Sequence, residues 1–307
     1  MSAIDTLFRK LRASGRKAFM PFVTAGDPDL DFTAEVIRRL AARGCSLFEL
    51  GIPYSDPIAD GPVIQASYTR ALGHKIKLAD ILAMVGRLTG SSVAGNALAA
   101  AGTAGNGLAA AGTAACGGSG ADVPSAAKRC DSCPPIVTML SYAIVFRQGL
   151  ERYVADAKAA GVSGAIVPDL PVEEAGPLAE ICRREDFSLI QLVTPTTPRD
   201  RALRIAERTT GFIYYVSVTG ITGERTALPP EIIDNVGWLR RQTPLPICIG
   251  FGISRPEHVR MLAPVADGLI VGSAIVRHIA ETAAKPREQV LDEIGDYAAE
   301  LLAAMGQ

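Results

Sequence analysis

Two carboxylates in the stretch 47–62 form the most informative chemical pattern of this sequence. An apolar run over 47–51 predicts a buried strand, yet it contains Glu49, an acid that a buried strand normally excludes. The proline-rich loop that follows supplies Asp56 and Asp60. Two acids at one strand end can serve as proton donor and acceptor, because different environments separate their pKa values. The pattern indicates acid–base catalysis, with a buried ion pair between Glu49 and an arginine as the structural alternative.

Glycine-rich turns in the second half of the chain predict a phosphate site. They are Gly-Phe-Gly-Ile-Ser at 250–254, Gly-Ser-Ala at 272–274 and Gly-Ile-Thr-Gly at 220–223. Glycine lets backbone N–H groups approach a phosphate, and a following helix N-terminus adds a favourable dipole. Ordinary strand-to-helix turns also favour glycine and serine, so each turn alone is weak evidence. Together they favour a phosphomonoester site.

Short apolar segments alternate with amphipathic ones along most of the chain. Strands are predicted at 18–23, 47–51, 136–140, 164–167, 188–193, 212–216, 246–249 and 268–271. Helices are predicted at 2–13, between the first two strands up to Gly44, at 171–184 and near the C-terminus. Eight β–α repeats suggest a parallel barrel with helices outside, although periodicity alone also permits a doubly wound open sheet.

The segment 89–132 departs from this alternation. It is rich in alanine, glycine and small polar residues, and 95–104 is repeated with little change at 105–114. Each glycine costs roughly 1 kcal/mol relative to alanine in a helix, and the segment has no apolar stripe that could dock. We interpret it as a flexible insertion within a single domain spanning 1–307. Cys130 and Cys133 at its end supply only half a tetrahedral metal site, so no metal is expected there.

The composition is that of a protein with a large buried core and no features of a nucleic-acid-binding or membrane protein. With 307 residues, 48% of them hydrophobic, the chain can bury a large core. A net charge of −1 gives no global attraction to nucleic acid or to an anionic membrane, and no apolar run is long enough to span a bilayer. The six cysteines form no disulfide-like framework, and Cys45 and Cys248 fit small core positions. A cytoplasmic location is the expectation.

Taken in order, these motifs resemble those of the tryptophan synthase alpha subunit family. The resemblance covers nearly the whole chain except the insertion. It includes Pro-Phe-Val-Thr-Ala-Gly-Asp-Pro at 21–28, Glu-Leu-Gly-Ile-Pro-Tyr-Ser-Asp-Pro at 49–57, Asp-Leu-Pro-Val-Glu-Glu at 169–174, Ser-Val-Thr-Gly-Ile-Thr-Gly at 217–223 and the two turns at 250–254 and 272–276. It implies a (β/α)8 TIM barrel with an extra N-terminal helix and an insertion before the third strand.

The resemblance also implies a reaction. The family is a carbon–carbon lyase that cleaves indole-3-glycerol phosphate to indole and glyceraldehyde 3-phosphate, a step in tryptophan biosynthesis. Glu49 would then shuttle protons, and Asp60 would hold the indole N–H as positive charge develops on the ring. The matched positions of the indole pocket and of the closing loop are Phe22, Ile64, Met139, Leu192, Tyr214 and Thr222. Those of the phosphate cradle are Gly223, Phe251, Gly252, Gly272 and Ser273.

Partners follow from the same resemblance. It implies a heterotetramer of two alpha and two beta subunits, with pyridoxal phosphate only in the beta subunit and neither cofactor nor metal in this chain. Ser141 and Ala143 replace a usual aromatic residue and a usual asparagine in a loop that contributes to the subunit contact. A catalytically weak homologue that mainly activates a beta subunit is the alternative function. Other phosphate-binding barrels of the pathway are disfavoured by the motif at 49–57.

Overall fold

The computed structural model describes residues 1–57, 60–91, 133–216, 230–250 and 252–306. Within these ranges every strand pairing is parallel. The strands are β1 Ala18–Thr24, β2 Phe48–Gly51, β3 Ile136–Met139, β4 Val162–Ile166, β5 Ser188–Ile190, β6 Leu192–Val193, β7 Ile213–Val216, β8 Ile247–Gly250 and β9 Gly268–Val271. All eight predicted strands are therefore present, with ends that differ by at most two residues.

The fifth predicted strand is divided into β5 and β6, which join the two ends of the sheet. The strand order is β5-β4-β3-β2-β1-β9-β8-β7-β6, so β5 and β6 stand at the two ends of the series. They are consecutive in the chain and separated only by Gln191, whose carbonyl accepts the Tyr214 N–H at 3.1 Å. β5 pairs with β4 and β6 pairs with β7, which makes an eight-stranded barrel and excludes the open sheet.

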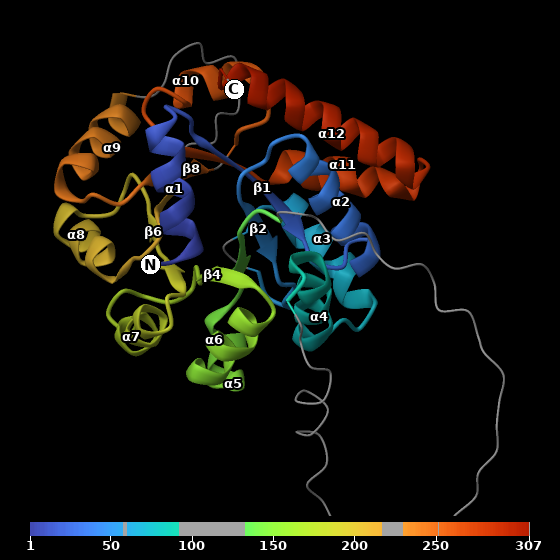
Figure 1. Ribbon diagram of the computed structural model, residues 1–307, viewed down its shortest axis with the longest axis horizontal. Coiled ribbons are helices and arrows are strands. Elements are labelled where there is room, and N and C mark those ends of the chain that lie inside the picture. The colour runs from blue at the N-terminus through green and yellow to red at the C-terminus, as the bar shows by residue number, and fades with distance from the viewer. Residues whose placement is uncertain (58–59, 92–132, 217–229, 251, 307) are drawn as a thin grey trace, which may run out of the picture.

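The helices surround the strands (Figure 1). They are α1 Ala3–Ala13, α2 Leu30–Ala42, α3 Pro62–Gly73, α4 Leu78–Thr89, α5 Tyr142–Gln148, α6 Leu150–Ala159, α7 Gly176–Arg184, α8 Arg199–Arg208, α9 Pro230–Gln242, α10 Pro256–Leu262, α11 Ser273–Ala280 and α12 Arg287–Ala304, with a 3₁₀ turn at Glu281–Ala283. The helix predicted from residue 171 begins later, because Pro171–Glu174 forms a turn closed by the Glu174 N–H and the Pro171 carbonyl.

Side chains on every second position of the strands point inward and fill the inside of the barrel. Ala18 and Met20 on β1, Val137 on β3 and Ile270 on β9 belong to one buried cluster. This cluster also contains Ile4, Phe8 and Leu11 of α1. The extra N-terminal helix therefore packs on the inner cluster, at the end where the strands begin. Side chains on the alternate positions of the strands pack outward against the other helices.

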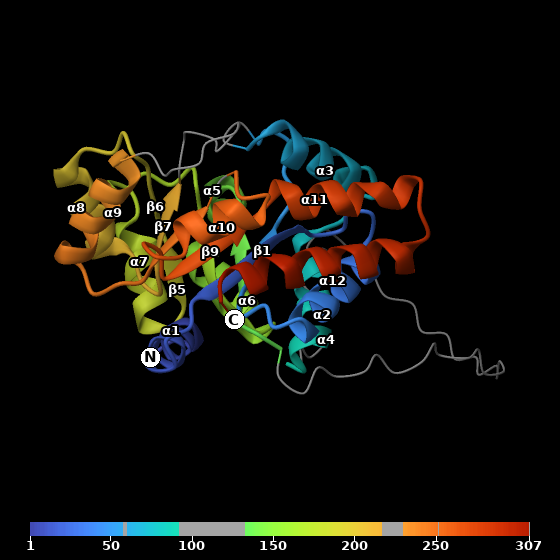
Figure 2. The same ribbon diagram turned by 90° about the horizontal axis from the view of Figure 1, so that it is seen from above.

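α11 and α12 lie side by side in both views (Figures 1 and 2). α12 also packs on α2, where Arg39 pairs with Glu288 and Asp292, and Arg43 with Asp296. These ion pairs are exposed and contribute little individually, so packing of the apolar faces stabilises this layer.

The predicted insertion lies outside the described residues between 92 and 132, as does Cys130. Its described neighbour Ser91 lies near Gly161, just before β4 begins. The chain therefore leaves the barrel at the end where strands start. In the described part of the chain, helices are too short or too polar to cross a bilayer.

Candidate active site

Glu49 is placed on β2 between Phe22 of β1 and Val137 of β3. Its side chain is 1% exposed, and neither carboxylate oxygen has a hydrogen-bond partner among the described residues. The structural alternative of a buried ion pair with an arginine is therefore not realised in this part of the chain. Burial, and then the nearby charge of Asp60, raises the pKa of Glu49 to about 8. At neutral pH the group carries a proton that it can donate.

Asp60 lies just before α3, in a loop where both its backbone N–H and its backbone carbonyl are hydrogen-bonded. Its N–H donates to the Pro57 carbonyl at 3.1 Å, and its own carbonyl accepts from Gln65 Nε2 at 2.8 Å. The Tyr54 hydroxyl donates to Asp60 Oδ2 at 3.1 Å. Burial raises the pKa of Asp60, and the Tyr54 hydrogen bond opposes that rise. The two acids thus differ in environment: Glu49 is enclosed and unpartnered, whereas Asp60 has a donor.

Both acids line one cavity of about 600 Å³, a volume typical of small-molecule sites. The cavity lies at the end of the barrel where the strands finish, the face that carries active sites in this fold. It brings together ten of the residues predicted from the sequence: Glu49, Asp60, Phe22, Ile64, Met139, Leu192, Tyr214, Gly252, Gly272 and Ser273. Three others, Thr222, Gly223 and Phe251, lie outside the described residues.

The wall beside Glu49 is apolar and closely packed. A Cβ atom on Gly51 would lie 2.4 Å from Phe22 Cζ, and one on Gly250 would lie 2.5 Å from the Tyr214 hydroxyl. Both aromatic rings therefore rest against glycines, where a larger residue would displace them. Burial raises the pKa of Tyr214 well above its ordinary value, so this wall stays uncharged. Such a surface suits a flat aromatic ring.

The turns that follow β8 and β9 form an end of the cavity that can bind an anion. Gly252 has φ +76°, a conformation that favours glycine, and α11 begins at Ser273 behind Gly272. Gly272 has no side chain that could cap the helix, so the first N–H groups of α11 remain available to a ligand. Gly252, Gly272 and Ser273 all border the cavity here.

Three basic residues at this end were missed by the sequence reasoning. Arg255, His258 and Arg277 also line the cavity. Burial, and then the charge of Arg255, lowers the pKa of His258, whose neutral Nδ1 accepts the Ser254 N–H at 3.3 Å. His258 thus fixes the glycine turn, while the arginines supply positive charge. The sequence position of Arg277 could have identified it, because it lies one helical turn after Ser273 and therefore faces the same end of the cavity.

Ser141 has a structural role in the loop after β3. Its hydroxyl donates to Asp169 Oδ2 at 2.6 Å and accepts the Ala143 N–H at 3.2 Å, which caps α5. Asp169 also accepts the Tyr142 N–H at 2.7 Å. The loops after β3 and β4 are therefore joined through one carboxylate. Ala143 contributes only its backbone N–H to this junction.

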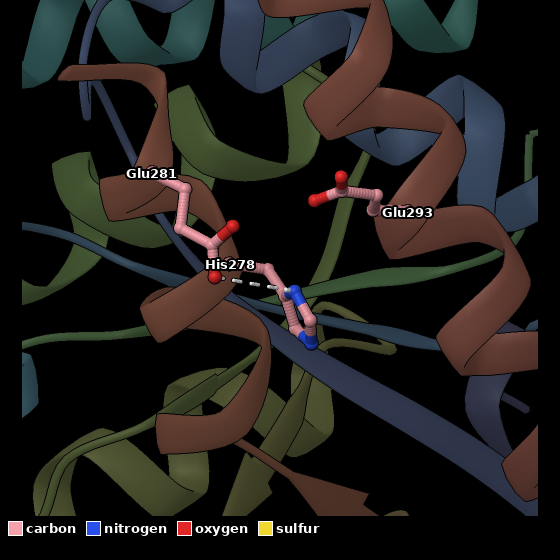
Figure 3. A group of neighbouring side chains, drawn as sticks. All are labelled: His278, Glu281 and Glu293. Atoms are coloured by element: carbon pink, nitrogen blue, oxygen red, sulfur yellow. Dashed lines mark ion pairs between the residues drawn. The ribbon is translucent and has the colours of Figure 1, made fainter. Parts of the chain in front are cut away.

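A second cluster of possible ligands lies away from the cavity. His278, Glu281 and Glu293 have ligand atoms within 4.8 Å of one another, and Figure 3 shows Glu293 on α12 facing the other two. Lys285 Nζ already lies 2.5 Å from Glu281 Oε2 and 2.8 Å from Glu293 Oε2. We interpret the group as an ion-pair cluster that fastens α11 to α12, because the ammonium group stands between the carboxylates.

Known proteins similar to this chain cover nearly its whole length. The family model described as tryptophan synthase alpha chain matches residues 8–94 and 122–305. A tryptophan synthase alpha chain from Rhodopirellula baltica is 51% identical over 304 residues, covering 97% of this chain and 96% of the relative. One from Chloroflexus aurantiacus is 38% identical over 307 residues, covering all of both chains.

Solved structures agree in fold. The crystal structure of tryptophan synthase subunit alpha from Legionella pneumophila superposes with a TM-score of 0.79 at 30% identity, covering 100% of this chain and 99% of that one. A tryptophan synthase complex from Pyrococcus furiosus gives a TM-score of 0.72 at 32% identity over 93% and 98% of the chains. By sequence over nearly its full length and by fold, this chain belongs to the tryptophan synthase alpha chain family.

Proposed function

We propose that this chain cleaves indole-3-glycerol phosphate to indole and glyceraldehyde 3-phosphate, with Glu49 transferring protons and Asp60 binding the indole N–H. The observation that carries the proposal is an unpartnered, fully buried carboxyl group that shares one largely apolar cavity with a second, hydrogen-bonded acid. A buried acid with a pKa of about 8 is suited to donate a proton at neutral pH.

The bond to be broken joins ring carbon C3 of the indole to the side chain. Its cleavage requires a proton at C3, stabilisation of the positive charge that develops on the ring, and removal of a proton from the side-chain hydroxyl. Protonated Glu49 supplies the proton to C3 and, as a carboxylate, then takes the hydroxyl proton as the bond breaks. The electrons of that bond restore the aromatic ring, and Glu49 ends the cycle protonated. Asp60 stabilises the cationic ring through its N–H.

Binding is divided between an apolar and a basic part of the cavity lining. The apolar wall of Phe22, Leu192 and Tyr214 accommodates the indole ring, and the phosphate lies at the N-terminus of α11. Arg277, within the same helix, adds positive charge for a dianion. The difference between the apolar and the basic part of the lining orients the substrate.

The phosphate assignment predicts the effect of Gly252→Val. Valine strongly disfavours φ +76°, so the turn moves and its N–H groups lose the phosphate. We expect the KM for indole-3-glycerol phosphate to rise by about tenfold or more while kcat changes by less than about threefold, measured by steady-state indole release. Gly15→Val is the matched control, since Gly15 has φ +68° and open space around it. An unchanged KM in Gly252→Val would place the phosphate elsewhere.

A beta subunit is the proposed partner. The Pyrococcus furiosus structure is described as a tryptophan synthase complex, which supports assembly of this chain with a pyridoxal-phosphate-dependent beta subunit into a heterotetramer. Ser55 and Asp56, on the chain that leads from β2 toward Asp60, are exposed and offer such a partner a surface near the candidate site. Cys45, Cys182 and Cys248 are buried free thiols, which supports a cytoplasmic location.

The experiment that tests the function supplies indole-3-glycerol phosphate to the purified chain and measures indole, with and without the cognate beta subunit. We expect indole from the chain alone and a changed rate in the complex, with light scattering giving two copies of each subunit. A chain that yields no indole alone but stimulates the beta reaction would support the activator alternative. A persistent monomer without rate change on mixing would contradict the partnership.

We further propose that the segment 92–132 takes no part in catalysis. The family model leaves 95–121 unmatched, and the segment joins the barrel at the end opposite the cavity. Loop closure depends only weakly on loop length, so such an addition costs the fold little.

A further inference from the structure

Tyr54 stands behind Asp60 and does not line the cavity that contains Glu49. Its hydroxyl donates to Asp60 Oδ2 at 3.1 Å, the only side-chain donor to that carboxylate among the described residues. Burial, and then the charge of Asp60, raises the pKa of Tyr54, so its hydroxyl remains a proton donor across the working pH range. The Tyr54 hydroxyl therefore acts on the substrate through Asp60.

The ring of Tyr54 is held in place by the barrel. Its centroid lies 5.4 Å from that of Tyr68 at an interplanar angle of 57°. Tyr68 is 1% exposed and belongs to a cluster with Phe22, Ile64 and Val276, against which Tyr54 packs. Because Tyr68 projects from α3 and Tyr54 from the loop after β2, this contact fixes the loop to the helix at the point where Asp60 connects them.

We propose that Tyr54 is a positioning residue for the cleavage reaction, which holds Asp60 with one carboxylate oxygen engaged and the other directed to the indole N–H. The inference rests on the proposed function and names a residue that the mechanism above does not use.

The geometry explains why such a residue is needed. Gln65 and Pro57 restrain only the backbone of Asp60, and neither fixes the rotation of its carboxylate. A charge-assisted hydrogen bond from a neutral donor does fix it, and it also favours the ionised form. An unrestrained carboxylate would turn toward solvent or take up a proton, and in both states it would stabilise the cationic ring less.

Other titratable groups around Asp60 bear on its protonation. Glu49 approaches from β2, Tyr68 from α3 and Tyr214 from β7, each close enough that the charge of Asp60 raises its pKa. Asp56 and Asp169 also act on Tyr54 and raise its pKa further. All these groups are acids, so Tyr54 is the neighbour that opposes the rise in the pKa of Asp60.

Tyr54→Phe tests the inference, because it removes the hydroxyl and keeps the ring on Tyr68. We expect kcat for indole release to fall by about tenfold with KM within about twofold, since a hydrogen bond to a charged group is lost. The acid limb of the kcat profile should move to higher pH, because Asp60 without its donor is protonated more easily. Tyr297→Phe, which makes the same change on α12 away from the cavity, is the control and should leave both unchanged.

The outcomes separate this inference from the proposed function. Wild-type kcat and pH profile in Tyr54→Phe would overturn it, as would a fall in kcat without movement of the acid limb, or a rise in KM alone. If Tyr54→Phe folds poorly, the pKa of Asp60 can be measured in the wild-type chain by carbon-13 NMR. A pKa of Asp60 at or above that of the buried, donor-free Glu49 would reject the positioning role of Tyr54. If the wild-type chain releases no indole, the function itself fails.

Discussion

Glu49→Gln is expected to lower kcat for indole release by at least about a hundredfold while the barrel stays folded. Glutamine fills the same space on β2 and can neither donate nor accept the transferred proton. Because the Glu49 carboxyl group has no hydrogen-bond partner among the described residues, its replacement breaks no described side-chain hydrogen bond. Steady-state indole release from the purified variant is the measurement.

Glu180→Gln on α7 is the matched control, since it removes an exposed carboxylate by the same change. Its kcat should equal that of the wild type. Rapid indole release from a folded Glu49→Gln variant would remove Glu49 from the mechanism.

The pKa of Glu49 also sets a pH dependence. The protonated form begins the reaction, so kcat should decline as pH rises through about 8, where the group loses its proton. The ionised form of Asp60 is the active one, so activity should also be lost as pH falls through its raised pKa. The profile is therefore bell-shaped.

Replacing Glu49 should raise stability, although it lowers activity. The pKa of Glu49 is raised from 4.5 to about 8 on folding, so between these values the folded state binds a proton that the unfolded state has released. The free energy of unfolding therefore decreases as pH rises through that window. Glu49→Gln removes this dependence, and at pH 8 the variant should be more stable than the wild type by roughly 3–5 kcal/mol in urea unfolding. The acid thus lowers stability in favour of function.

The architecture could be predicted from sequence because the strands are short, apolar and regularly spaced. The division of one strand at Gln191 could not be predicted, since it depends on β5 and β6 pairing with different neighbours. The late start of α7 was also missed: the turn at Pro171–Glu174 contains residues that are compatible with a first helical turn. Local patterns identify elements, and tertiary pairing fixes their ends.

Some residues of the candidate site could likewise be predicted from the sequence, and others could not. Glu49 stood out because an acid interrupts an apolar run, and Asp60 because it follows in the same loop. Arg255, His258 and Arg277 were missed because each lies within an amphipathic helix or its cap, where a basic residue usually indicates a solvated face. Tyr54 was missed for another reason: its role depends on the distance to Asp60, which no spacing along the chain reveals.

Asp60→Asn is expected to lower kcat by at least about a hundredfold, with a smaller rise in KM. The amide oxygen of asparagine can still accept one hydrogen bond, so part of the ground-state binding to the indole N–H remains. The negative charge that stabilises the cationic ring is lost, and this stabilisation is needed only as the proton reaches C3. Asp234→Asn, an exposed carboxylate on α9, is the control for the loss of a charge. Indole release at the wild-type rate from a folded Asp60→Asn variant would contradict the assignment.

The pH profiles of the two variants separate the two acids. Asp60→Asn should lose the acid limb and keep the decline near pH 8, although the absent charge of Asp60 will lower that pKa somewhat. Glu49→Gln should lose the alkaline limb. Since the two groups act in one step, the double variant should be only slightly slower than the slower single variant. If instead the kcat of the double variant fell by the product of the two single losses, the acids would act in separate steps. Asp60 would then be needed for binding rather than for the proton transfer that Glu49 performs.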